Sequence, residues 1–313
     1  MRTLICGSIA FDNIMVFNGQ FKDHILPESI HILNVAFLVP ELRREFGGCA
    51  GNIAYNLKKI GGDPLIMATI GKDADSYVQR MDQLGLSRDA VRQMDDAMTA
   101  QAFITTDLDD NQITAFHPGA MNQSHLNQIT PALGAGLAIV APDGRDGMLQ
   151  HAEQLAQHKI PFMFDPGQGL PMFSGEELLR FAKAASYIAV NDYEGKMLEE
   201  KTGQSLPKLA EHVKALIVTR GAVGSTIYAE GKQHDIPCVK ASAIVDPTGC
   251  GDAYRAGLLY GIAHQWGWQA CGHLASVLGS IKIASRGGQN HALSRELVAK
   301  IHREAFGSDP WQA

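Results

Sequence analysis

The sequence predicts an α/β fold, in which a largely parallel central sheet is flanked by helices. Short apolar runs typical of buried strands alternate with segments of helical periodicity along most of the 313 residues. Hydrophobic residues make up 45% of the chain, which is enough for a sizeable core without disulfide bonds. We therefore expect a single domain over residues 1–313.

The expected elements follow one another in strand and helix order. Apolar runs predict strands at residues 4–6, 65–70, 137–140, 162–164, 187–190 and 215–219. Helical patterns cover residues 48–60, 76–84, 147–157, 176–185, 194–200 and 253–262. Three strands end in polar residues or glycine, at 165–167, 191–192 and 219–221. Because ligands bind beyond the carboxyl ends of parallel strands, these residues are expected to share one crevice.

Two segments break this alternation. Residues 12–46 and 99–117 contain strand-like runs with little helical periodicity, and residues 109–112 are typical of a hairpin turn. Together the two segments predict a small accessory sheet. Over the crevice such a sheet would act as a lid that excludes water from a reactive phosphate. The alternative is an ordinary hairpin at the edge of the main sheet.

Composition excludes several classes of protein. The net charge of −6 gives no overall basic field, so nucleic acid is not an expected partner. Five cysteines without a C-x-x-C pair indicate neither a disulfide framework nor a structural zinc site. No signal-like leader or membrane-length apolar run is found, so we expect a soluble cytoplasmic protein that does not bind membranes.

Residues 245–257 form the most informative motif. Pro247 excludes a regular central strand, Gly249 and Gly251 permit a tight turn, and a buried helix is expected to follow. Backbone N–H groups would converge at the start of this helix and bind an anion. A carboxylate at Asp252 beside a phosphate makes sense if it takes a proton from an attacking hydroxyl. The alternative is an Asp that merely stabilises the first helical turn.

A second glycine cluster covers residues 47–51 and opens another helix. Gly48 would let a small ligand approach the backbone, and Asn52 can donate to and accept from a diol. Close helix packing would explain the same glycines. Asp12 follows the first strand and adds an acceptor for a second hydroxyl, and an Asx turn is the alternative local explanation.

Two further junctions carry weaker signals. Asn191 and Glu194 stand three residues apart after a strand, so they either organise a hydrated magnesium ion or form a capping box. Residues 219–224 either fold around a nucleotide or simply turn the chain. The sequence contains no Walker motif, no complete dinucleotide fingerprint, no G-x-S-x-G and no H-E-x-x-H.

These motifs together resemble the ribokinase and adenosine-kinase superfamily, the PfkB carbohydrate kinases. The first signature is carried by Gly47, Gly48, Asn52, Ala54, Gly61 and Gly71, and the second by residues 246–252. The resemblance covers essentially the whole chain and implies a ribokinase-like fold with a small β-sheet lid. Residues 109–114, 165–171 and 246–248 with 254–257 are most similar to prokaryotic nucleoside kinases of broad specificity.

The resemblance implies transfer of the ATP γ-phosphate to the 5′-hydroxyl of a nucleoside of the adenosine, inosine, guanosine or cytidine type. Asp252 would be the catalytic base, and the amides of Gly249, Cys250 and Gly251 would stabilise the moving phosphoryl group. The residues implied to bind substrate are Asp12, Gly48, Asn52 and Gln168. Those implied to bind ATP are Gln112, Asn191, Thr219, Gly221, Gly224 and Asn290, the last beside the adenine.

The same resemblance implies that Glu194 and Asp165 organise Mg²⁺ through water. It leaves open a monovalent cation such as K⁺ near Asp246 and Ser285, and a homodimer formed through paired lids. Cys250 stands where most family members have alanine or serine. At an anion-binding turn its thiol is either activated by a lowered pKa, and thus open to alkylation, or only a small filler.

Two alternatives to a nucleoside kinase stay open on the sequence. A sugar kinase of the same fold, resembling ribokinase or fructokinase, would share every catalytic motif, since only the pocket for the base separates the two. A regulator that binds the ligand without catalysis is the other alternative. Retention of Asp252 beside Gly249 and Gly251 speaks against it, because binding alone needs no proton acceptor next to the phosphate.

Overall fold

A nine-stranded sheet forms the centre of the protein. The computed structural model describes residues 1–25, 34–109 and 111–312. Within these residues the strand order is β13-β12-β11-β10-β9-β8-β1-β4-β5, parallel except where β12 pairs antiparallel with β11 and β13. The strands are β1 Arg2–Cys6, β4 Asp63–Gly71, β5 Ser87–Met94, β8 Leu137–Val140, β9 Phe162–Phe164, β10 Tyr187–Asn191, β11 Ala215–Thr219, β12 Ser225–Ala229 and β13 Lys232–Ile236. The predicted parallel sheet is confirmed.

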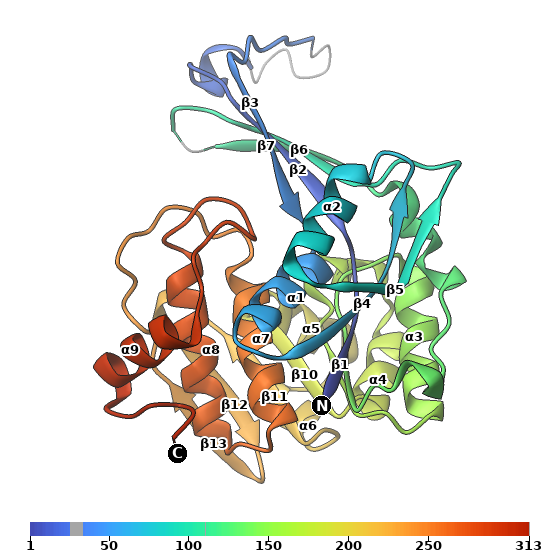
Figure 1. Ribbon diagram of the computed structural model, residues 1–313, viewed down its shortest axis with the longest axis vertical. Helices are drawn as coiled ribbons and strands as arrows, with labels where there is room; N and C mark the ends of the chain where they lie inside the picture. The colour runs from blue at the N-terminus through green and yellow to red at the C-terminus, as the bar shows by residue number, and fades with distance from the viewer. Residues whose placement is uncertain (26–33, 110, 313) are drawn as a thin grey trace.

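Helices cover both faces of this sheet (Figure 1). On β1, Ile5 belongs to one apolar cluster with residues of α1, α7 and α8, whereas Leu4 and Cys6 face a second cluster with residues of α3 and α4. This alternation is what a strand buried on both sides requires. The α-helices are α1 Cys49–Lys59, α2 Asp75–Leu84, α3 Arg145–Gln157, α4 Gly175–Ala184, α5 Asp192–Thr202, α6 Leu206–Ala210, α7 Cys250–Ala263, α8 Trp268–Lys282 and α9 Arg295–Phe306.

Short 3-10 helices occur in the connections. They are η1 Phe21–Asp23, η3 Gly119–Leu126, η4 Pro131–Leu133, η5 Gly167–Met172 and η6 Gly221–Val223. Two of them follow the carboxyl ends of central strands, η5 after β9 and η6 after β11, so they border the crevice that the sequence predicts.

A separate four-stranded sheet projects from the α/β body (Figure 1). Its order is β3-β2-β6-β7, with β2 Ala10–Val16, β3 Glu41–Gly47, β6 Ala100–Thr106 and β7 Gln112–His117. The strands come from the two segments that the sequence singled out, so the predicted accessory sheet is confirmed. In the hairpin between β6 and β7, the Asp107 carboxylate accepts from the backbone nitrogens of Asp109 and Asn111. Asp110 in this turn and residues 26–33 of the first segment lie outside the described residues.

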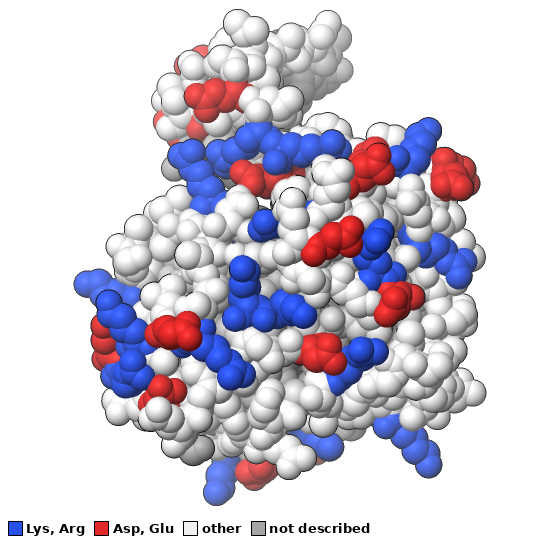
Figure 2. Space-filling model, viewed as in Figure 1, with Lys and Arg blue, Asp and Glu red and all other residues white. Residues whose placement is uncertain are grey.

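The surface carries charges of both signs. Figure 2 shows acidic and basic side chains intermixed over one face, with a basic stretch where the small sheet meets the body. At the base of the small sheet, Arg43 pairs with Glu45 at 3.5 Å and Arg44 pairs with Asp73 at 3.5 Å. No helix within the described ranges is long and apolar enough to span a membrane.

Candidate active site

A cavity of about 520 Å³ lies between the small sheet and the α/β body. The small sheet contributes Asp12, Ala102, Thr114 and Phe116, and the body contributes Ser8, Gly48, Asn52, Gln168, Gly249 and Asp252, among others. Its volume is in the range of pockets that hold small-molecule ligands. The small sheet therefore covers the crevice as a lid, and the structure brings together six of the residues that the sequence assigned to catalysis or substrate.

The start of α1 is built for close approach of the backbone. Gly48 has φ +84°, and a Cβ on it would lie 2.5 Å from the carbonyl oxygen of Ser8. Only glycine can occupy this position without displacing the connection between β1 and β2. The Ser8 hydroxyl in turn accepts a hydrogen bond from the Cys49 nitrogen at 3.1 Å. Ser8 was missed by the sequence argument, although it directly follows the first predicted strand.

Asp252 lies in the first turn of α7 at the base of the cavity. The helix begins after Gly249, which has φ +77° and caps the N-terminus without a side chain. Burial raises the pKa of Asp252 to about 6, while a hydrogen bond from Asn52 Nδ2 to Asp252 Oδ2, 2.9 Å long, works in the opposite direction. A carboxylate with this pKa at a helix N-terminus can accept a proton near neutral pH.

A chain of hydrogen bonds fixes the orientation of the Asn52 amide. Gln289 donates from Nε2 to Asn52 Oδ1 at 3.2 Å and contacts the hydroxyl of Tyr77 at 2.7 Å, and that hydroxyl donates to the Gly47 carbonyl at 2.7 Å. Since Oδ1 of Asn52 is an acceptor here, its Nδ2 must point to Asp252. Asn52 lines the cavity as expected, yet its donor contacts the candidate base. Gln289 and Tyr77 carried no signal in the sequence.

Asp12 lies at the lid side of the same cavity. Burial raises its pKa to about 6, and the nearby carboxylates of Asp246 and Glu45 contribute in the same direction. The Asp12 carboxylate also accounts for the glycine at position 47, because a Cβ on Gly47 would lie 2.4 Å from Asp12 Oδ2. An acceptor so placed suits a hydroxyl of the ligand.

The turn before α7 is held by the Asp246 carboxylate. It accepts from the nitrogens of Thr248 and Gly287 at 2.9 and 2.8 Å. Burial acts to raise the pKa of Asp246, but these hydrogen bonds lower it overall. Cys250 differs from the expectation of an activated thiol, because burial raises its pKa to about 11. A thiol with a raised pKa fits the alternative, in which Cys250 is only a small side chain that fills space.

The predicted magnesium residues are engaged with protein partners. Asp165, directly after β9, accepts two hydrogen bonds of 3.1 Å from Arg255, and both side chains are almost fully buried. Asn191 and Glu194 form the capping box of α5, with Glu194 Oε2 accepting from the Asn191 nitrogen at 2.7 Å. Burial raises the pKa of Glu194. Arg255 is a residue that the sequence argument left without a role, although it follows Asp252 by one helical turn.

The remaining predicted residues are not among those that line the cavity. Thr219 ends β11 beside β10, and Gly221 and Gly224 form the turn around η6 with φ values of +51° and +100°. Gln112 begins β7, where it shares a face with Thr114 and Phe116 of the cavity. Asn290 donates to Glu45 of the lid at 2.6 Å. Its expected place beside the adenine stays a prediction.

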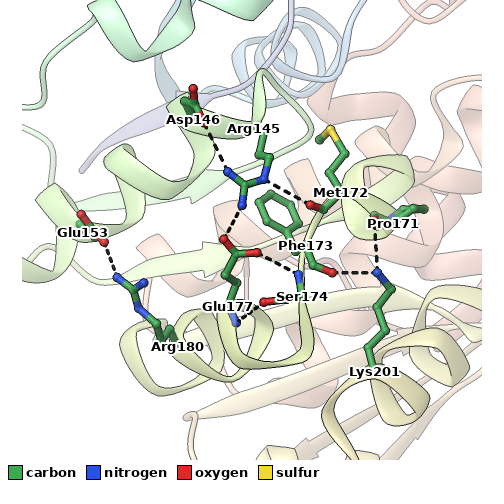
Figure 3. A network of polar contacts seen from close by, with 10 residues as sticks. All are labelled: Arg145, Asp146, Glu153, Pro171, Met172, Phe173, Ser174, Glu177, Arg180 and Lys201. Atoms are coloured by element: carbon green, nitrogen blue, oxygen red, sulfur yellow. Dashed lines mark hydrogen bonds and ion pairs between the residues drawn. The ribbon is translucent and has the colours of Figure 1, made fainter.

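The segment that carries Gln168 is anchored from outside the cavity (Figure 3). Arg145 donates to the Met172 carbonyl at 3.3 Å and also pairs with Glu177. Lys201 donates to the carbonyls of Pro171 and Phe173 at 3.0 and 2.7 Å. These contacts hold η5 so that Gln168 and its neighbours face the cavity.

A helix N-terminus with a half-buried carboxylate in its first turn, at the carboxyl edge of a parallel sheet and under a β lid, is the arrangement of a phosphotransferase with a ribokinase-like fold. The family model described as pfkB family carbohydrate kinase matches residues 14–295, and the chain belongs to this family.

Proteins similar to this chain include nucleoside kinases. The nucleoside kinase of Burkholderia thailandensis in complex with inosine is 56% identical, with a TM-score of 0.90 and coverage of 98% of this chain and 99% of that chain. The same kinase in complex with ADP-inosine gives 57% identity, a TM-score of 0.88 and coverage of 98% and 97%. A nucleoside kinase of Methanocaldococcus jannaschii is 31% identical over 82% of this chain and 85% of its own.

Proposed function

We propose that this chain transfers the γ-phosphate of ATP to the 5′-hydroxyl of a nucleoside. The observation that carries the proposal is the half-buried Asp252 carboxylate, which lies in the first turn of α7 and lines a covered cavity. The similarity to a nucleoside kinase that binds inosine supports the same substrate class. Asp12 and Gly48 would hold the ribose hydroxyls at the lid side.

In the proposed reaction, Asp252 accepts the proton of the 5′-hydroxyl as that oxygen attacks the γ-phosphorus. The new O–P bond forms while the bond between the γ-phosphorus and the bridging oxygen of ATP breaks, and ADP leaves with that oxygen. The amides of Gly249, Cys250 and Gly251 are proposed to stabilise the negative charge on the transferred group, for which the Cys250 nitrogen would have to release the Pro247 carbonyl that it contacts at 3.1 Å. Asn52 keeps the Asp252 carboxylate aimed at the cavity.

Residues for ATP and its metal ion are proposed along the neighbouring strand ends. Asn191 and Thr219 end β10 and β11, which are adjacent, so the phosphates and the nucleoside of ATP would lie along this edge. Mg²⁺ usually keeps several waters and binds substrate phosphates, where it neutralises their charge. The carboxylates of Glu194 and Asp165 retain free lone pairs on oxygens that already accept one hydrogen bond, so they fit contact through such waters.

The lid favours a nucleoside over a simple sugar. Phe116 contributes an aromatic ring to the cavity, and Thr114 and Gln168 contribute polar groups. A flat heterocycle with polar edges matches this combination, because it can pack on the ring and form hydrogen bonds at its rim.

Exposed apolar residues of the lid support the proposed homodimer through paired lids; they are Leu42, Phe103 and Ile113. Measurement of the mass of the protein in solution tests this proposal.

A coupled ADP-release assay tests the proposed activity. Inosine, guanosine, adenosine and cytidine are compared with ribose and fructose at a fixed ATP concentration. We expect kcat/KM for the preferred nucleoside to exceed that for either sugar by a factor on the order of 10² or more, because sugars lack the contacts of the base. Turnover of ribose or fructose with none of any nucleoside would instead identify a sugar kinase.

The pH dependence follows from the Asp252 carboxyl. A base must be deprotonated, and burial raises its pKa to about 6 in the free enzyme. We expect kcat/KM for the nucleoside to be constant above this pH and to fall about tenfold per pH unit below it. Measurement at saturating ATP from acidic to neutral pH checks this. A profile that stays flat through pH 6 would contradict the assignment.

A further inference from the structure

Lys282 places a buried ammonium group directly beneath the anion-binding turn. It is the last residue of α8, and its side chain is fully buried. Its Nζ donates to the carbonyl oxygens of Asp246 and Ser285, both at 2.9 Å. Its Cε lies 3.6 Å from the position that a Cβ would take on Gly249. A buried charge is tolerated only when hydrogen bonds satisfy it, and these two carbonyl oxygens provide such bonds for Lys282.

The two carbonyls belong to loops that together shape the turn. Val245 donates to the Ile283 carbonyl at 2.9 Å, and Gly287 donates to Asp246 Oδ2 at 2.8 Å. Lys282 joins the same two loops from the inside. The start of α7, whose amides are proposed to stabilise the transferred phosphoryl group, follows directly after this junction. The ammonium therefore fixes the conformation of the loop that leads into the anion site.

A monovalent cation is expected at this junction by the resemblance to the wider superfamily. Backbone carbonyl oxygens are ligands that can replace the hydration shell of K⁺. Here the carbonyls of Asp246 and Ser285 already accept hydrogen bonds from Lys282, and its positive charge would repel a second cation at contact distance. The residues present therefore do not fit a bound K⁺.

We propose that the Lys282 ammonium replaces the monovalent cation, holding the anion-binding turn in its active conformation, so that this chain needs no K⁺ for catalysis. The proposal rests on the kinase function proposed above. It predicts that the unmodified protein has the same kcat with inosine and ATP in KCl and in tetramethylammonium chloride at equal ionic strength, within about twofold. Activation by K⁺ of about fivefold or more would overturn it.

The substitution Lys282→Ala opens the space that the ammonium fills. We expect kcat to fall by a factor on the order of 10 to 10², and K⁺ or NH₄⁺ to restore most of it in a saturable manner, while tetramethylammonium does not. In Lys282→Met the side chain fills the space without a charge, so the same loss should persist in every salt. An unchanged kcat in Lys282→Ala, or a loss that neither K⁺ nor NH₄⁺ reverses, would refute the proposal.

Thermal unfolding gives a readout that needs no nucleoside. The Tm of Lys282→Ala should rise with KCl relative to tetramethylammonium chloride and then saturate, whereas the Tm of the unmodified protein should be equal in both salts. Because this measurement does not involve turnover, it separates failure of this inference from failure of the proposed kinase function. A Tm of Lys282→Ala that is equal in the two salts would count against replacement of a cation.

Lys201 offers a matched control. Its Nζ also donates to two backbone carbonyls, those of Pro171 and Phe173 at the end of η5 (Figure 3), and not to the loops that lead into α7. Lys201→Ala should therefore show no difference between KCl and tetramethylammonium chloride in either kcat or Tm. A specific response to K⁺ in this variant would show that any unpaired pair of carbonyls responds in this way, and would remove the support for Lys282.

Discussion

Replacing Asp252 with Asn is expected to lower kcat by a factor on the order of 10² to 10⁴ while KM for ATP changes by less than about threefold. Asparagine has nearly the same shape as aspartate and can still accept the hydrogen bond from Asn52 Nδ2, so α7 should begin in the same way. The lost group is the proton acceptor for the attacking hydroxyl. Steady-state rates of ADP release at varied ATP concentration measure both quantities.

Asp192→Asn is the matched control, because Asp192 also lies in the first turn of a helix but is exposed at the start of α5. It tests whether a carboxylate at a helix N-terminus matters only through its effect on the helix. We expect its kcat to stay within about twofold of the unmodified protein. If Asp252→Asn behaved like this control, Asp252 would be a helix-stabilising residue and the base would have to be sought elsewhere.

The sequence predicted the elements whose periodicity reflects burial on a defined face. Strands such as β1 and β8 are short apolar runs, and their positions agree with the expectation to within two residues. Helix α8 was not predicted, because it packs against α7, β13 and α9 and is buried on most sides, so it lacks a polar stripe. The β12–β13 hairpin was not predicted either. Its turn consists of Glu230 and Gly231, both with positive φ, and Glu-Gly is a weaker turn signal than Asn-Gly.

The residues of the candidate site also fall into those that the sequence could predict and those that it could not. Residues at strand ends, such as Asn191 and Thr219, could be assigned to one crevice because a parallel sheet brings its carboxyl ends together. Partners contributed by distant segments could not, since Asn52 meets Gln289 only through the tertiary fold. The altered pKa of Cys250 has the same origin. Its local position at a helix start left both an activated thiol and a small filler open, whereas burial in the folded protein raises its pKa to about 11.

Replacing Arg255 with Met is expected to reduce the free energy of unfolding by about 3–5 kcal/mol. Arg255 and Asp165 are 4% and 5% exposed, and two hydrogen bonds of 3.1 Å join them. Methionine removes the guanidinium but leaves the Asp165 carboxylate buried without its partner. Urea unfolding followed by circular dichroism gives this free energy, provided that the slope of the transition is unchanged.

An exposed ion pair supplies the control for this loss. Arg180 pairs with Glu153 at 2.5 Å, yet the two side chains are 67% and 62% exposed, so Arg180→Met should cost only about 0–1 kcal/mol. Combining Asp165→Asn with Arg255→Met should cost less than the sum of the two single changes, because neither buried group then carries an unpaired charge. If Arg255→Met costs no more than Arg180→Met, the buried pair is not what joins α7 to the end of β9.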